Sequence, residues 1–197
     1  MKKELIISHE GAQSKIALLE DGRLLELHEQ EDKSDFVVGD LFIGKVKKLA
    51  PNLNAAFVSI GYEKDAFLHY QDLGPQFLTY KKFLKDTVSK KQETTSLKNF
   101  EIQKEIDKHG TIEKVLAKED SVILQITKEP ISTKGPRIST QISLTGRFLV
   151  LIPFDKSVSI SKKISSAEER ERLRTLIESI KPEGFGVIIR TVAEGKK

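Results

Sequence analysis

Two short runs of alternating apolar residues, 55–60 and 66–69, constrain the fold of this chain more than any other feature. Successive side chains of a β-strand point to opposite faces of a sheet, so every second residue shares a face. If the small and aliphatic residues of each run face a core, then Phe57, Phe67 and His69 point the other way. The two runs therefore predict neighbouring strands with a pair of phenylalanines on the outer face, where polar residues are the rule.

The outward phenylalanines have two interpretations. Exposed aromatic rings beside lysines suit stacking on unpaired nucleobases, because every base has a π-face. Alternatively, Phe57 and Phe67 are core residues of a sheet that is buried on both faces.

The strand predicted before them, 41–49, favours a barrel. It places Lys45 and Lys47 on an outer face, which could be the face that carries Phe57, and Gly44 inside it fits a tightly coiled strand. Short, twisted, antiparallel strands of this kind predict a small barrel of the OB type.

Composition bounds the class of protein. The chain has 197 residues, 31% of them charged, and a formal net charge of +4, so we expect a folded, soluble protein whose mild basic excess alone supports nucleic-acid binding only weakly. The absence of cysteine excludes disulfides and thiolate zinc sites, and it fits a cytoplasmic location. The amino terminus resembles neither a signal peptide nor a membrane-spanning helix.

The first 30 residues predict a small sheet without a cover. Three short strands are expected at 5–7, 15–19 and 23–27, the last two joined by a hairpin turn at 20–22. Three strands with one apolar face need another layer to cover them. No neighbouring segment supplies that layer, so we expect the partner to lie elsewhere or beyond the end of the chain.

Residues 75–110 predict a charged insertion in the barrel. Apolar residues at helical spacing near 77–84, and more loosely at 100–106, indicate one or two helices around a mobile centre near 90–96. The many lysines of this segment could contact RNA, although a solvated charged face explains them as well.

Two further segments offer phosphate contacts. The turn at 133–137 carries Lys134 and Arg137 around a glycine that frees the backbone, which suits a phosphate contact or a plain surface loop. Near the carboxyl terminus, a strand at 148–152, a helix capped at Ser165 or Ser166 and a strand at 187–189 lead to Arg190 and Thr191. The helix is expected to carry one apolar stripe, with its arginines mostly outside: Leu173, Leu176, Ile177 and Ile180 on the stripe, and Arg170, Arg172 and Arg174 away from it. A guanidinium beside a hydroxyl can hold a terminal phosphate, but an exposed strand end is the simpler alternative.

Catalytic arrangements are missing from the sequence pattern. The four histidines have no metal-ligand spacing, no order of serine, histidine and aspartate stands out, and no aspartate pair suggests a two-metal site. We therefore predict no catalytic residues and no metal ligands in this chain, which is built to bind.

Seven motifs in order resemble the amino-terminal half of the ribonuclease E/G family. The matching segments are 43–46, 53–58, 66–69, 133–135, 142–146, 149–153 and 189–191. Any one of them is weak, and the second and third alone indicate only an S1-type OB domain, but seven in register are specific.

The resemblance implies a β-rich α+β fold of three parts. Residues 1–36 would be the first part of an RNase H-like subdomain, 37–140 an S1-type OB domain that binds single-stranded RNA with 75–110 as its insertion, and 141–197 a sensor of the RNA 5′-monophosphate. Phe57, Phe67 and Lys134 match RNA-contacting positions.

In the sensor part, Arg190 and Thr191 match phosphate ligands, and Gly146 and Val150 match backbone-contacting and packing positions. Lys163 stands where the family has arginine, so a bidentate contact there becomes a point charge.

The family's magnesium-binding aspartates and its cysteine zinc link lie in later parts. The resemblance thus implies the RNA-binding, 5′-end-sensing portion of a magnesium-dependent endoribonuclease that cleaves single-stranded RNA in RNA processing and decay. This portion would be inactive by itself and without cofactor, and the full-length enzyme would be a dimer or tetramer. A stand-alone RNA-binding module and a scaffold whose barrel binds protein remain alternatives.

Overall fold

The computed structural model describes residues 2–10, 13–31, 36–91, 96–131 and 134–196 of the chain. These residues form two compact units, Met1–Val37 and Val38–Lys197. Each unit is described by itself. Within the described residues no helix is long and apolar enough to cross a membrane.

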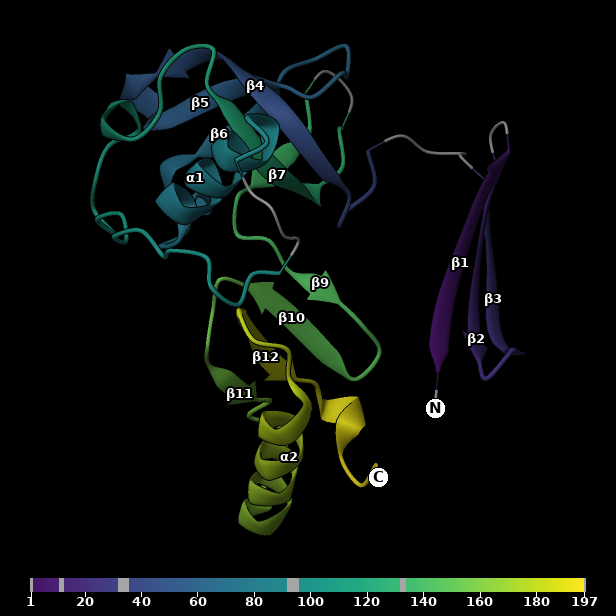
Figure 1. Cartoon of the computed structure of the whole chain (residues 1–197). Coiled ribbons are helices and arrows are strands. Elements are labelled where there is room, and N and C mark those ends of the chain that lie inside the picture. Colours follow the sequence, from purple (N-terminus) through teal and green to yellow (C-terminus); the bar gives the residue numbers. More distant parts are fainter. Residues whose placement is uncertain (1, 11–12, 32–35, 92–95, 132–133, 197) are drawn as a thin grey trace. The chain divides into compact units, whose positions relative to one another are not determined.

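The first unit is a three-stranded antiparallel sheet in the order β1-β2-β3, formed by Lys3–Glu10, Gln13–Glu20 and Arg23–Glu31 (Figure 1). The turn between β2 and β3 has left-handed φ at Asp21 and Gly22, the combination that matches the twist of a two-residue hairpin. Six of its larger apolar side chains are about half exposed or more: Leu5, Ile6, Ile7, Leu24, Leu25 and Leu27. The three strands are as predicted and are longer than the sequence pattern suggested.

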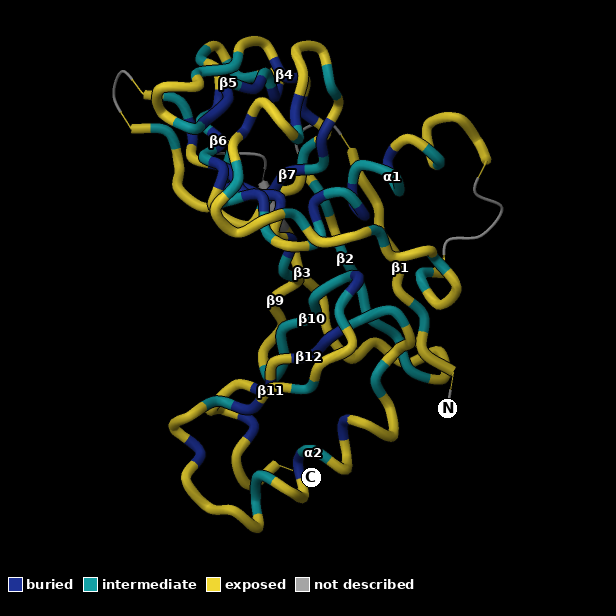
Figure 2. The backbone as a smooth tube through the Cα atoms, turned by 90° about the vertical axis from the view of Figure 1, so that its left-hand side faces the viewer, coloured by how far each residue is buried: buried dark blue, intermediate teal, exposed yellow. Residues whose placement is uncertain are grey.

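A closed five-stranded barrel begins the second unit. Its strands are β4 (Leu41–Ala50), β5 (Ala55–Ser59), β6 (Ala66–His69), β7 (Ser121–Lys128) and β8 (Arg137–Ser139), in the spatial order β4-β5-β6-β8-β7. All neighbours are antiparallel except β6 and β8, which are parallel. Buried segments of the second unit lie in these strands and also in the sheet and helix near the carboxyl terminus (Figure 2).

Gly44 makes the barrel interior tight. A Cβ at this position would lie 2.5 Å from Leu124 Cδ1 and 2.7 Å from Val58 Cγ1. Both neighbours are completely buried, so there is no space for a side chain on this part of β4.

The insertion contains one α-helix, α1 (Phe77–Val88), followed after residue 96 by irregular chain. The expectation of helix from the spacing at 100–106 is therefore wrong, and the predicted mobile centre falls largely on 92–95, outside the described residues. Instead, Phe100 packs edge-on against Phe83, with ring centroids 5.4 Å apart, and lies 5.4 Å from Phe154. Packing of Phe100 into this aromatic cluster accounts for one apolar residue of the stretch, whereas Ile102 is 41% exposed.

A four-stranded sheet and a second α-helix complete the second unit. The sheet order is β11-β12-β10-β9, from Val158–Ile160, Phe185–Ile189, Leu149–Pro153 and Leu144–Thr145, and α2 (Ala167–Ile180) packs on it (Figure 1). Four short 3₁₀ turns join elements of this unit: η1 (Pro51–Leu53), η2 (Tyr70–Asp72), η3 (Ile112–Lys114) and η4 (Thr191–Ala193). The fold is β-rich α+β, as predicted.

The apolar stripe predicted on α2 is buried only in part. Leu173 and Ile177 join the core with Val187 and Ile189 of β12, whereas Leu176 is 40% and Ile180 is 64% exposed. Two of the four stripe residues therefore join the core, and the other two stay largely exposed.

Two arginines of α2 also differ from the prediction that they lie mostly outside. Arg170 donates to the backbone oxygens of Ser161 and Ile164, and Arg174 donates to the oxygen of Val158. These bonds tie the helix to the segment that leads into it.

Candidate nucleic-acid interface

Phe57 and Phe67 lie directly opposite each other on β5 and β6. Their ring centroids are 5.8 Å apart and the ring planes meet at 66°, an edge-to-face arrangement. Both rings are half-buried, while their neighbours Val58 and Leu68 are fully buried. The alternation therefore places the two rings outside the barrel interior, as predicted.

The two rings line a groove of about 770 Å³ on the outside of the barrel. Four of its side chains are cationic (Lys64, Lys128, Lys134 and Arg137), and two are acidic (Asp65 and Glu129). Aromatic rings within a mostly cationic rim are the combination that binds single-stranded nucleic acid.

The loop between β7 and β8 forms one wall of this groove, and close backbone packing holds it against β6. The amide of Phe67 donates to the backbone oxygen of Pro136 at 2.9 Å. A Cβ on Gly135 would lie 2.2 Å from the backbone oxygen of Asp65. Glycine is needed here for close approach, not for the freedom of φ expected from the sequence. Thr133 of the predicted turn lies outside the described residues.

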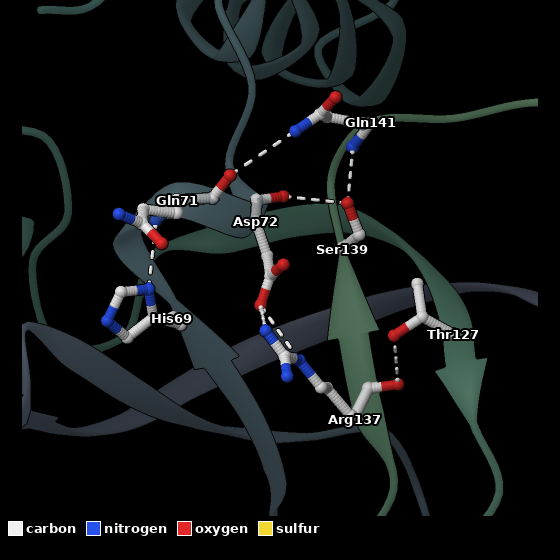
Figure 3. Close-up of polar contacts among 7 residues, drawn as sticks. All are labelled: His69, Gln71, Asp72, Thr127, Arg137, Ser139 and Gln141. Atoms are coloured by element: carbon white, nitrogen blue, oxygen red, sulfur yellow. Dashed lines mark hydrogen bonds and ion pairs between the residues drawn. The ribbon is translucent and has the colours of Figure 1, made fainter. Parts of the chain in front are cut away.

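Arg137 is held in place by an acidic partner. Its Nε and Nη2 donate to Asp72 Oδ2 at 3.1 and 2.8 Å (Figure 3). Asp72 in turn is fixed through its backbone oxygen, which accepts from Ser139 Oγ at 2.7 Å. The guanidinium has five N–H donors, so the ion pair leaves capacity for a further acceptor. The pair orients this predicted contact residue at the edge of the groove.

His69 lies on the outer face as predicted, and its side chain also caps the turn that follows β6. Its Nδ1 accepts from the Gln71 amide at 3.1 Å and caps η2 (Figure 3). This bond assigns the proton of the neutral ring to Nε2. The half-buried imidazole can then act only as a donor toward a ligand.

The two lysines predicted on β4 differ in their surroundings. Lys45 is half-exposed and pairs with Glu119 at 2.8 Å, and this contact lowers the pKa of Glu119. A bulge between Val46 and Lys48 changes the alternation, so that Lys48 rather than Lys47 lies opposite Phe57. Lys48 is thus the β4 cation nearest to the aromatic pair in the register, and period-two counting missed it.

A second set of predicted residues converges at the carboxyl end of β12. Arg190 Nη1 donates to the backbone oxygen of Gly146 at 2.6 Å, and the hydroxyls of Thr191 and Ser161 are 2.9 Å apart. The backbone amide of Lys163 donates to the same Ser161 hydroxyl at 3.3 Å. Thr191 and Lys163 therefore meet at Ser161, a residue that no sequence pattern had singled out, while Arg190, the neighbour of Thr191, is bonded to Gly146.

Val150 supports this arrangement from the sheet. It pairs with Ile188 on one side and with Thr145 on the other, one residue before Gly146. Its half-buried side chain is part of the scaffold that carries the loop 146–148.

The donor set does not suit a metal. Within the described ranges, no group of three or more histidine, cysteine, aspartate or glutamate side chains could hold an ion. The donors and rings of the two sites are of the kinds that bind anions and stack on flat rings.

Comparisons with known proteins agree with the resemblance read from the motifs. The model of the family described as "Ribonuclease E/G family" matches residues 143–197. The chain is 39% identical over 160 residues to "Ribonuclease E" of Nostoc sp. (strain PCC 7120), covering 81% of this chain and 19% of the relative. It is 34% identical over 192 residues to "Ribonuclease G" of Haemophilus influenzae, covering 98% of this chain and 35% of the relative.

"Ribonuclease G" of Escherichia coli (strain K12) is 33% identical over 195 residues, covering 99% of this chain and 36% of the relative. The chain thus spans between about a fifth and about a third of the length of these relatives.

Proposed function

Because the chain belongs to the ribonuclease E/G family, we propose that it is the RNA-binding and 5′-end-sensing part of an endoribonuclease that acts on single-stranded RNA. The observation that carries the proposal is the pair of half-buried rings, Phe57 and Phe67, inside a groove whose rim is mostly cationic. Rings supply base stacking without sequence preference, and the cations supply contacts to phosphate.

The barrel supports an assignment to the OB fold and its S1 type. A five-stranded barrel closed by a parallel pair between its third and fifth strands in chain order is compatible with the OB architecture, which binds oligonucleotides on its outer face. The aromatic pair lies on the second and third of these strands, where OB domains hold their ligands.

The second site supports recognition of a 5′-monophosphate. Arg190 is oriented by the carbonyl of Gly146, and Thr191 and Ser161 present adjacent hydroxyls. A guanidinium and two hydroxyls are suitable donors for a terminal phosphate. In the proposed enzyme, Lys163 would add a point charge to this pocket.

RNA binding is tested by titrating this chain with a 3′-labelled, unstructured oligoribonucleotide at several salt concentrations. Affinity should fall steeply as salt rises, because each neutralised phosphate releases a counterion. Phe57→Ala should cost about 1–3 kcal/mol of binding free energy if the ring stacks on a base. Phe100→Ala, which removes a half-buried ring that does not line the groove, is the matched control. Equal affinity of the Phe57 variant and the parent would refute the stacking role.

Sensing of the 5′ end is tested by comparing 5′-phosphorylated with 5′-hydroxyl RNA. The parent should prefer the phosphorylated end, and Arg190→Lys should reduce that preference several-fold while leaving the affinity for 5′-hydroxyl RNA unchanged. The 5′-hydroxyl RNA is the internal control for folding and for the barrel. An unchanged preference in the variant would remove the sensor assignment.

Cleavage itself is proposed for the whole protein, with magnesium in the reaction and a zinc link in its assembly. We expect this chain to bind RNA without cutting it, so magnesium-dependent cleavage by the isolated chain would contradict the proposal. A stand-alone binding module is less favoured, since the relatives named above are all ribonucleases.

A further inference from the structure

Two aliphatic side chains extend the aromatic pair within the same groove. Leu53 is 56% exposed and Ile131 is 70% exposed, and both line the groove with Phe57 and Phe67. A single exposed leucine or isoleucine is ordinary on a protein surface. Four large apolar side chains that line one groove are less ordinary, because a gathering of exposed apolar groups marks binding sites.

The structure holds both aliphatic residues at fixed places. Leu53 ends η1, and the next residue, Asn54, has left-handed φ and bonds through its side chain to Gly110 O and Ile112 N at 3.1 and 2.7 Å. Ile131 forms a two-way backbone bridge with Lys134, whose neighbouring glycine packs on β6. Neither residue depends on the apolar core for its position, so each is available to a ligand.

The geometry of the two rings explains why nearby aliphatic side chains would help to bind a base. Rings that meet at 66° with centroids 5.8 Å apart cannot sandwich a flat base between them. A base stacked on one ring has its second face toward water unless another apolar group covers it. Leu53 and Ile131 are the aliphatic side chains that line this groove.

The charge of the rim indicates which occupant the groove takes. Lys64, Lys128 and Lys134 line it together with Arg137, against the carboxylates of Asp65 and Glu129. An apolar floor within a net cationic rim suits a flat, uncharged ring attached to an anionic backbone. An apolar peptide would bury its contacts without using the cations.

We propose that Leu53 and Ile131 are the aliphatic walls of a slot that takes one unpaired nucleobase against the phenylalanine pair. This inference rests on the proposed RNA binding and adds that the bound RNA presents an unpaired base. The slot accepts a base with both faces free and therefore excludes a base that is stacked within a duplex. Leu53 and Ile131 thus contribute to selection of unpaired RNA.

The test compares two ligands of equal length and charge: a short 3′-labelled uridine oligomer and the corresponding abasic ribose-phosphate chain. The parent should prefer the uridine oligomer. Leu53→Ala and Ile131→Ala should each weaken binding of the uridine oligomer about fivefold, and together they should remove most of the preference over the abasic chain. The salt dependence of binding should stay unchanged, because neither side chain contacts phosphate.

Matched controls separate the slot from general effects. Ile180→Ala removes an isoleucine of similar exposure, 64%, from α2 and should leave both affinities unchanged. Thermal unfolding should be unaffected by all three substitutions, since each removed side chain is mostly exposed.

The outcomes distinguish the slot from the proposed function. If the parent does not bind the uridine oligomer, the RNA-binding function fails. If Phe57→Ala weakens binding but Leu53→Ala and Ile131→Ala do not, the slot alone is refuted. Equal binding of double-stranded and single-stranded RNA by the parent, or binding of an apolar peptide in place of RNA, would also overturn it.

Discussion

At the scale of single residues, two glycines allow the close packing of the barrel and of the loop beside the groove. Gly44 leaves room for Leu124 and Val58 inside the barrel, and Gly135 lets the loop that carries Lys134 approach the backbone of Asp65. Neither residue has a positive φ. Both glycines allow neighbouring atoms to approach the backbone closely. An alanine would be disfavoured because its Cβ would overlap with those atoms, not because of backbone strain.

Gly135→Ala should displace the loop from β6. Overlap with a backbone oxygen cannot be relieved by rotating a side chain, so we expect a loss of about 1–3 kcal/mol in the free energy of unfolding, together with weaker RNA binding. Denaturant titration and RNA titration measure the two effects. Lys134→Ala is the comparison, because it should weaken RNA binding and leave stability unchanged. A fully stable Gly135 variant would show that the loop is not packed as described.

At the scale of elements, the start of α2 shows a capping box used in a different way. Ser166 Oγ accepts from the Glu169 amide at 3.3 Å, as the sequence predicts. The Glu169 carboxylate, however, accepts from Arg172 at 2.7 Å and from the Gly195 amide at 2.8 Å instead of returning to the cap. The helix start is therefore tied to the segment that follows Arg190 and Thr191.

These contacts predict an acid-dependent stability. The hydrogen bonds from Arg172, and then that from Gly195, lower the pKa of Glu169 from 4.5 to about 2. A pKa that is lower in the folded than in the unfolded state contributes stability above pH 4.5, and this contribution is lost as the pH falls toward about 2.

Denaturant titrations of the parent and of Glu169→Gln at a series of pH values measure this contribution. The difference in free energy of unfolding should be largest above pH 4.5 and should shrink toward pH 2. Glu168→Gln, in the same helical turn, keeps the bonds of Glu169 and should follow the parent. A difference that is constant with pH would show that Glu169 is not engaged in solution.

At the scale of the whole molecule, the buried side-chain amide of Gln125 links two parts of the second unit. The Gln125 side chain on β7 donates to the backbone oxygens of Gly39 and Ser143 and accepts from the Ser143 amide, each at 2.9 Å. It is 7% exposed, and its bonds join the barrel to the strand that leads to Gly146. The groove and the proposed phosphate site therefore lie in the same compact unit.

The division into two units predicts that residues 38–197 fold without the first sheet. The barrel closes through β4 and β7, and the amide of Gly39 bonds to Ile126 within the second unit. Deletion of residues 1–37 should therefore leave the thermal midpoint of the second unit and its RNA affinity within a few degrees and about twofold of the parent. Loss of cooperative unfolding in the shortened chain would contradict the division.

Local periodicity in the chain was sufficient to predict several features. The alternation at 55–69 placed Phe57 and Phe67 outside the barrel interior, and the serine before α2 marked where that helix begins. The motifs also indicated the family. These features depend on the geometry of a strand or a helix, which a few neighbouring residues determine.

Tertiary structure decided what no short segment contains. A bulge in β4 puts Lys48 opposite Phe57. Phe100 packs on Phe83 in irregular chain where a helix was expected. The hydroxyl of Ser161 lies next to that of Thr191, 30 residues further along the chain. Each of these depends on residues far apart in the chain. Their contacts are set by how the elements close and pack together, so no periodicity along the sequence could have revealed them.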